Sequence, residues 1–155
     1  MKLIKTRRKI DWLVVHCTAT REGQDIIVEQ IRQWHLNRGW SDIGYHYIID
    51  IHGTIYEGRP VTRQGAHVKG FNKNSIGIVY VGGVDRNLAP KDTRTEQQKA
   101  SLLYLLCELK DLYPNSKVQG HRDFSPDLNN NGIIEPFEFI KACPSFNAKE
   151  EYKNI

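Results

Sequence analysis

The chain has 155 residues, of which 39% are hydrophobic and 26% are charged. That length supports one domain with a buried core and is too short for two. No apolar run approaches the roughly 20 residues of a membrane span, so we expect no membrane partner. Lys and Arg number 22 against 18 Asp and Glu, and the resulting charge of +4 suits an anionic partner without naming one.

The N-terminus and the cysteines bear on the cellular compartment. The start, MKLIKTRRKIDWLVVHC, follows its basic cluster with an apolar run that is too short, and too interrupted by Asp11, for a signal peptide. We therefore expect synthesis in the cytoplasm. Cys17, Cys107 and Cys143 are an odd number at wide spacing, which disfavours a disulfide framework and leaves at least one thiol for metal binding or catalysis.

The first half of the chain predicts three strands and a helix. The apolar, β-branched run at residues 12–17 predicts a buried strand that ends in small polar residues. After Asp25, a candidate N-cap, apolar residues at near-helical spacing predict a helix that stops at Gly39 and carries His35 on its surface. Residues 44–60 predict two strands joined by a glycine turn.

The second half continues the alternation of strands and helices. Residues 75–82 predict an apolar strand, and residues 95–113 predict a long helix that Pro114 ends. A short strand at residues 117–121 follows, and a last helix begins near Asn147. The pattern predicts an α/β fold: a single domain, residues 1–155, with a mixed central β-sheet flanked by helices. The apolar stripe of the long helix consists of Leu102, Leu105, Leu106 and Leu109.

Two histidines and one cysteine are candidate metal ligands. His16 and His121 each end an apolar strand, where a sheet can present a side chain rigidly to a cleft. Two imidazoles with the thiolate of Cys143 suit Zn²⁺, and three protein ligands leave the fourth tetrahedral position for water. Spacing alone leaves open a simpler interpretation, because a histidine at a strand end is often only a hydrogen-bonded polar residue.

Seven segments then carry a resemblance that covers nearly the whole chain. They are WLVVHCTAT, GWSDIGYHYIID, GTIYEGRP, GAHVKGFNKNSIGI, YVGG, GHRDFSPD and KACPSF. In this order they resemble the zinc-dependent N-acetylmuramoyl-L-alanine amidases of the type 2 family, which includes phage amidase endolysins and shares its fold with the peptidoglycan recognition proteins. The resemblance implies that the chain cuts the amide bond between N-acetylmuramic acid and L-alanine in peptidoglycan.

The same resemblance implies roles for individual residues. His16, His121 and Cys143 match the zinc ligands, Tyr45 matches a tyrosine that faces the bound water, and Lys141 matches a lysine two residues before the ligand cysteine. A lysine there can stabilise the oxyanion of a tetrahedral intermediate. Tyr45 has an alternative interpretation, because Tyr45 and Tyr47 lie two apart in a predicted strand and so share a face, where either can simply be core or rim packing.

Further residues are candidates with simpler alternatives. In the family, the segment that holds His67 lies beside the substrate groove, so the resemblance makes this histidine a candidate substrate contact; ordinary loop structure is the alternative. Arg59, Asn72 and Asn74 are weaker candidates on the same argument. Cys17 cannot pair with His16 as thiolate and base, since adjacent strand residues point to opposite faces. We expect Cys17 and Cys107 to be buried.

Between His121 and Cys143 the chain inserts DLNNNGIIEPFE, residues 127–138, which matches the calcium loop of an EF-hand. Calcium bound there would fix the path that delivers Lys141 and Cys143 to the zinc. The alternative is an Asn-rich turn without an ion, since Asn and Asp bond their own backbone. The loop positions 1, 3, 5, 6, 7, 9 and 12 hold Asp127, Asn129, Asn131, Gly132, Ile133, Glu135 and Glu138.

Two other functions compete with hydrolysis. A module of the same fold can bind peptidoglycan or muropeptides without cutting them. The basic residues at positions 5 and 7–9 suggest a nucleic-acid binder, but no nucleic-acid motif accompanies them, so we expect no nucleic-acid partner. We expect a monomer that reaches the cell wall on lysis or otherwise acts on fragments in the cytoplasm.

Overall fold

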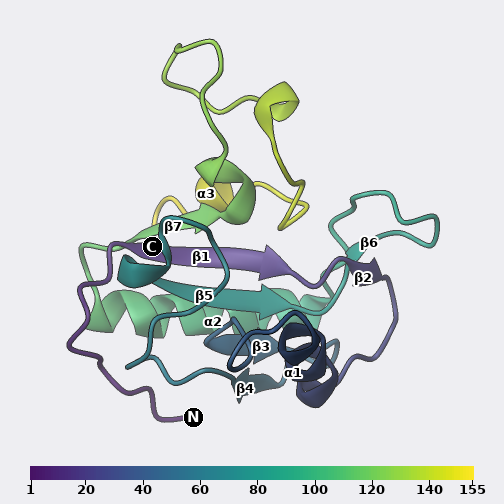
Figure 1. The fold of residues 1–155 in the computed structure, drawn as a ribbon, viewed down its shortest axis with the longest axis vertical. Coiled ribbons are helices and arrows are strands. Elements are labelled where there is room, and N and C mark those ends of the chain that lie inside the picture. The colour runs from purple at the N-terminus through teal and green to yellow at the C-terminus, as the bar shows by residue number, and fades with distance from the viewer.

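The computed structural model describes residues 1–155, and its centre is a five-stranded sheet in the order β4-β3-β5-β1-β7 (Figure 1). Strands β3, β5, β1 and β7 are parallel, and β4 pairs antiparallel with β3. The predicted mixed sheet is confirmed. The strands are β1 (Trp12–Cys17), β3 (Tyr47–Ile49), β4 (Ile55–Glu57), β5 (Ser75–Tyr80) and β7 (Lys117–Gly120).

The central strands are buried on both faces, which explains their continuous apolar sequences. In β1, Leu13 and Val15 belong to the larger core cluster, and Val14 and His16 point to the opposite face. The larger cluster is covered by α2 (Glu96–Leu112) and α3 (Ala148–Glu151), whereas α1 (Val28–Asn37) covers the smaller cluster on the other side. His16 therefore lies on the face of the sheet that α2 does not cover.

Helix α1 departs from the prediction at its start and in its buried side chains. It begins at Val28, and Asp25 is not its N-cap; the cap position is Ile27, whose N–H donates to Gln30 Oε1 at 3.1 Å. His35 was expected on the surface, but it is buried, and its Nδ1 accepts a hydrogen bond from the Gly44 N–H at 2.8 Å. The helix therefore packs through Ile31 and His35.

Helix α2 follows the prediction closely. Thr95 caps it: its Oγ1 accepts from the Gln98 N–H, and Gln98 Oε1 accepts from the Thr95 N–H, each at 3.0 Å. Cys107 is exposed and not buried as expected, because the leucine stripe that faces the sheet lies on the other side of the helix. Cys17 is buried as predicted.

The segment 126–141, called the arm below, projects from the rest of the molecule (Figure 1). Its only regular structure is a short 3₁₀ turn, Pro136–Glu138. Two further 3₁₀ turns, Asn72–Asn74 and His121–Phe124, flank the sheet, and β2 (Thr20–Arg21) pairs with β6 (Gly83–Val84) in a separate small sheet. No helix has both the length and the apolar character needed to cross a membrane.

The buried histidines predict a pH dependence of stability. Burial lowers the pKa of both His35 and His46 from 6.5 to about 4. Between these values the unfolded chain binds more protons than the folded protein, so the free energy of unfolding should decrease as pH falls, by up to about 1.4 kcal/mol per pH unit for each histidine. Denaturant unfolding of the metal-free protein at steps from pH 7 to pH 4.5 measures this slope.

His35→Gln is the matched variant for this measurement. It removes one titrating imidazole and keeps a side-chain acceptor on α1. The free energy of unfolding should therefore fall less steeply as pH decreases, by the contribution of one histidine. An unchanged slope would mean that His35 does not contribute.

Candidate active site

Three metal-ligand atoms converge where β1 and β7 end. The side chains of His16, His121 and Cys143 place one nitrogen or sulfur each within 4.8 Å of one another. Cys143 Sγ lies 3.7 Å from His16 Nδ1. Two such ligands on one tetrahedral zinc are about 3.6 Å apart, given the usual Zn–S and Zn–N bond lengths. The donor set and its spacing therefore fit zinc.

The surroundings of these side chains also suit a cation. Burial lowers the pKa of His121 to about 4, and burial and neighbouring imidazoles lower the pKa of His16 well below its usual value. Both rings are therefore neutral and have a lone pair free for a metal. Burial, together with the Cys17 thiol, raises the pKa of Cys143 well above its usual value. A thiolate at Cys143 thus requires a cation beside it.

Cys17 lies beside the ligand cysteine. Its backbone N–H donates to Cys143 Sγ at 3.3 Å, and its own Sγ lies 3.8 Å from Ser145 Oγ. The contact with Cys143 lowers the pKa of Cys17 to about 7. The hydrogen bond from the Cys17 main chain stabilises the thiolate form of Cys143. This role of Cys17 does not involve its own side chain.

Tyr45 lies next to His16, with the two ring centroids 5.2 Å apart. It packs with the smaller core cluster, whereas Tyr47 belongs to the larger one. The expectation that these two tyrosines share a face is wrong, because β3 begins only at Tyr47 and the chain is not a regular strand before it. Burial raises the pKa of Tyr45 above its usual value, so its hydroxyl stays protonated.

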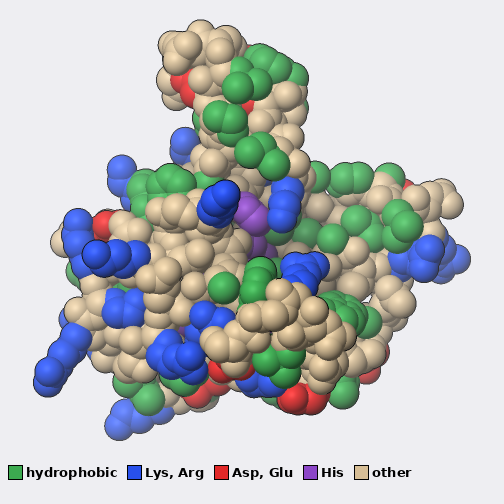
Figure 2. All heavy atoms as spheres, viewed as in Figure 1, with side chains coloured by type: hydrophobic (Ala, Val, Ile, Leu, Met, Phe, Trp, Pro, Cys, Tyr) green, Lys and Arg blue, Asp and Glu red, His purple; other side chains and the backbone are tan.

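A pocket of about 640 Å³ opens beside the metal ligands. His121 and Lys141 line it, with Trp40, Phe124 and Ile140 as apolar walls. Figure 2 shows histidine atoms in a hollow at the centre of this face, below the arm and flanked by Lys and Arg side chains. The structure therefore brings Lys141 and a candidate metal ligand, His121, to one cleft.

His67 and Asn72 also line this pocket. The Nδ1 atom of His67 is 2.9 Å from His16 Nε2, and its Nε2 atom is 3.1 Å from Ser75 Oγ. Asn72 Oδ1 accepts hydrogen bonds from the N–H groups of His67 and Val68 at 2.8 and 2.9 Å. Asn72 thus holds the loop in place, and His67 contacts His16, a candidate metal ligand.

The other two candidate substrate contacts do not reach the pocket. Arg59 is buried, and its guanidinium donates to the carbonyl oxygens of Asp42, Ile43 and Gln64 at 2.8 to 3.1 Å. Asn74 donates from Nδ2 to Asp11 Oδ2 at 2.6 Å. Both side chains hold separate segments of the chain together.

One residue of the N-terminal basic cluster also serves the fold. The guanidinium of Arg8 donates to the carbonyl oxygens of Val61 and Ser75 at 2.8 and 2.7 Å. It is therefore committed to the protein's own backbone and does not extend toward a nucleic acid.

Sequence reasoning did not identify His46, Ser75 or Gly77 as parts of the site. His46 Nδ1 accepts from the Gly77 N–H at 3.0 Å, and Ser75 contacts His67. Gly77 gave the one available signal, because a lone glycine within an apolar strand indicates close approach by another group.

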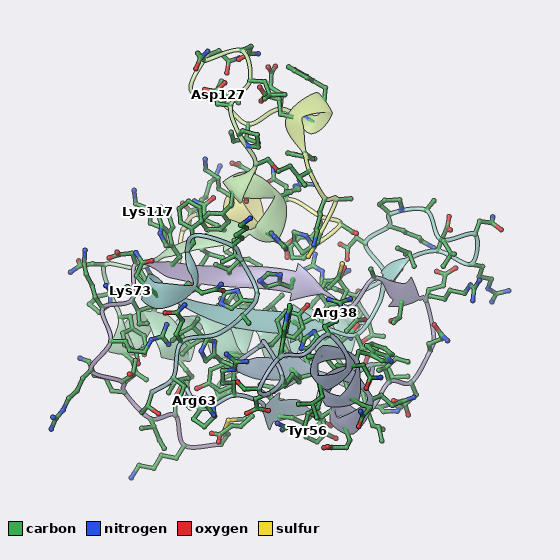
Figure 3. All side chains as sticks on the ribbon, viewed as in Figure 1. Arg38, Tyr56, Arg63, Lys73, Lys117 and Asp127 are labelled. Carbon is green, nitrogen blue, oxygen red and sulfur yellow. The ribbon has the colours of Figure 1, made fainter.

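The loop 127–138 closes through its own hydrogen bonds. Asp127 accepts from the N–H groups of Asn131 and Gly132 at 3.2 and 2.7 Å. Glu138, with only 3% exposure, accepts from the N–H groups of Leu128 and Glu135 at 2.7 and 2.8 Å. Figure 3 shows Asp127 on the arm, away from the sheet. Hydrogen bonds of this kind also form in an Asn-rich turn that holds no ion.

Comparison with known proteins identifies the family. The model of the family N-acetylmuramoyl-L-alanine amidase matches residues 6–133. The endolysin of Enterobacteria phage K11 is 39% identical over 95% of this chain and 88% of its own length, and peptidoglycan-recognition protein 2 of Holotrichia diomphalia is 30% identical over 78% and 67%. The structure of the amidase LysC from Clostridium intestinale matches with a TM-score of 0.71 at 28% identity, covering 93% of this chain and 82% of that one. This chain belongs to the N-acetylmuramoyl-L-alanine amidase family.

Proposed function

We infer that this protein hydrolyses the amide bond between N-acetylmuramic acid and L-alanine in peptidoglycan, with a zinc ion held by His16, His121 and Cys143. The observation that carries this inference is the convergence of two imidazoles and one thiol beside a pocket, in a chain of the amidase family. Zinc at this position supplies a Lewis acid that makes water nucleophilic near neutral pH and polarises the scissile carbonyl.

Lys141 and Tyr45 complete the proposed site. Lys141 is exposed on the wall of the pocket, where its ammonium can stabilise the oxyanion of the tetrahedral intermediate. Tyr45 retains its phenolic proton because burial raises its pKa, so it acts as a hydrogen-bond donor and not as a base. Its ring lies beside that of His16, with the ring centroids 5.2 Å apart.

The first prediction concerns the bond that is cut. Zinc-loaded protein incubated with purified peptidoglycan should release free stem peptides that begin with L-alanine, detected by mass spectrometry. Cys143→Ala should release none, because the thiolate ligand is lost. Cys107→Ala, at an exposed position on α2, is the matched control and should release them normally.

If folded, zinc-loaded protein releases nothing from either polymer or soluble muropeptides, the non-catalytic binding module becomes the better interpretation. Binding affinity for muropeptides would then be the quantity to measure.

The second prediction concerns Lys141. Lys141→Gln should lower kcat by about 100-fold or more, the usual effect of removing one oxyanion-stabilising group, with the zinc content unchanged. Lys141→Arg should recover part of the loss because it restores the charge. Lys149→Gln, an exposed lysine on α3, serves as the control. A kcat for Lys141→Gln within about threefold of the original would remove Lys141 from the mechanism.

We propose in addition that the loop 127–138 binds calcium. Support comes from its position-by-position match to an EF-hand loop and from the left-handed backbone at Gly132, φ +82°, at the place of the sharp turn. The loop lies between two metal ligands in sequence, so its order bears on the position of Cys143. Calcium would then be structural.

This proposal predicts a calcium-specific gain in stability. Protein stripped of metal and reloaded with zinc alone should show a rise in Tm on titration with CaCl₂ but not with MgCl₂, because binding to the folded state stabilises it. Glu138→Gln should abolish the rise, since it removes the bidentate carboxylate at loop position 12. A Tm and an activity that stay constant up to millimolar calcium would contradict it.

We propose further that the protein acts on the wall when the host cell lyses. Support for this comes from the phage K11 relative, whose name is endolysin. The net charge of +4 favours approach to an anionic wall but is too small to supply specificity.

A further inference from the structure

We propose that His67 is a positioning residue for the zinc ligand His16: its Nδ1 atom accepts the N–H of His16 Nε2 and so fixes which nitrogen of His16 faces the metal. This inference rests on the proposed zinc site. It replaces the hypothesis that His67 contacts substrate. The role of His67 follows from the partners of the ring nitrogens of both histidines and from the slot in which the His67 ring lies.

The two nitrogens of His16 face different partners. Nδ1 lies 3.7 Å from Cys143 Sγ, on the side where the three ligand atoms meet, and Nε2 lies 2.9 Å from His67 Nδ1. A nitrogen that binds a metal uses its lone pair and carries no proton, so the proton of the neutral ring must be on Nε2. His16 Nε2 is therefore the donor and His67 Nδ1 the acceptor.

The same reasoning places the proton of His67. If Nδ1 accepts, the proton of the neutral ring lies on Nε2, which is 3.1 Å from Ser75 Oγ and donates to it. Metal-bound histidines usually donate their second N–H to a carboxylate, a carbonyl or water. Here the acceptor is a second imidazole, that of His67. The hydrogen bonds therefore run from His16 through His67 to Ser75.

Two glycines leave the space that the His67 ring occupies. A Cβ at Gly77 would lie 2.6 Å from Cγ and Cδ2 of His67, and a Cβ at Gly65 would lie 2.6 Å from Cδ2. These separations are shorter than van der Waals contact, so a side chain at either position would displace the ring. Gly77 belongs to β5, whose partner β1 carries His16. The sheet thus sets the distance between the two histidines.

His67 has no polar ring atom left for substrate. Both nitrogens are engaged, its exposure is 8%, and Asn72 holds its backbone N–H. It lines the pocket without offering a free ring nitrogen. Its chemistry is therefore directed at His16, and its effect on hydrolysis passes through the metal ligand.

The test measures zinc affinity by competition with a chromogenic chelator. His67→Leu fills the slot with a side chain that cannot accept a hydrogen bond, and should weaken zinc binding by about 10- to 100-fold, the usual effect of losing an outer partner of a metal ligand. His67→Asn keeps an acceptor near the position of Nδ1 and should retain most of the affinity. His35→Leu is the control, because it removes another buried histidine. The ring of His35 accepts its hydrogen bond from the Gly44 N–H, so this variant should leave zinc affinity unchanged.

The outcomes separate the two inferences. If the unmodified protein does not bind zinc, the proposed function fails. If it binds zinc and folded His67→Leu binds equally well, or if His67→Asn is as weak as His67→Leu, the positioning role of His67 fails while the proposed function stands.

A second measurement needs no variant. Long-range ¹H–¹⁵N NMR spectra of the zinc-loaded protein report the protonated nitrogen of each histidine ring. We expect protons on Nε2 of both His16 and His67. A proton on Nδ1 of His67 would overturn the proposal, even if His67→Leu failed to fold.

Discussion

The site depends on the pairing of two adjacent parallel strands. The register of β1 and β7 places Val15 opposite Gly120, so the next residues, His16 within β1 and His121 just after β7, lie side by side. Gly120 also lets the third ligand approach, because a Cβ there would lie 2.6 Å from Pro144 Cδ. The metal-binding geometry is thus a direct result of sheet hydrogen bonding, and the pocket and arm are arranged around it.

Burial determines the charge state of the polar groups near the ends of β1 and β7. Neutral imidazoles at His16, His35 and His46 accept or donate hydrogen bonds inside the fold, where charged rings would be too costly. Low polarity also keeps the Cys143 thiol protonated unless a cation is bound. The same apolar surroundings that stabilise the fold therefore make a thiolate at Cys143 dependent on a neighbouring cation.

Local pattern predicted the features that depend on neighbouring residues in the chain. The strand 12–17 and the long helix follow from periodicity, and both appear as expected. The buried position of His35 depends on Gly44, and the contact of His16 with His67 joins residues 51 positions apart. No local pattern encodes such contacts. Residue chemistry made Cys143 one candidate ligand and the resemblance singled it out, whereas the family match ends at residue 133, before it.

The base of the arm is closed by two hydrogen bonds. The Arg122 N–H donates to the Cys143 carbonyl at 2.8 Å, and the Ile140 N–H donates to Ser125 Oγ at 3.1 Å. These two bonds hold the entry and the exit of the arm next to each other, and order within the arm adds to what they fix. A segment whose two ends already meet is a natural place for inserting new sequence, because the chain on either side of it continues along its original path.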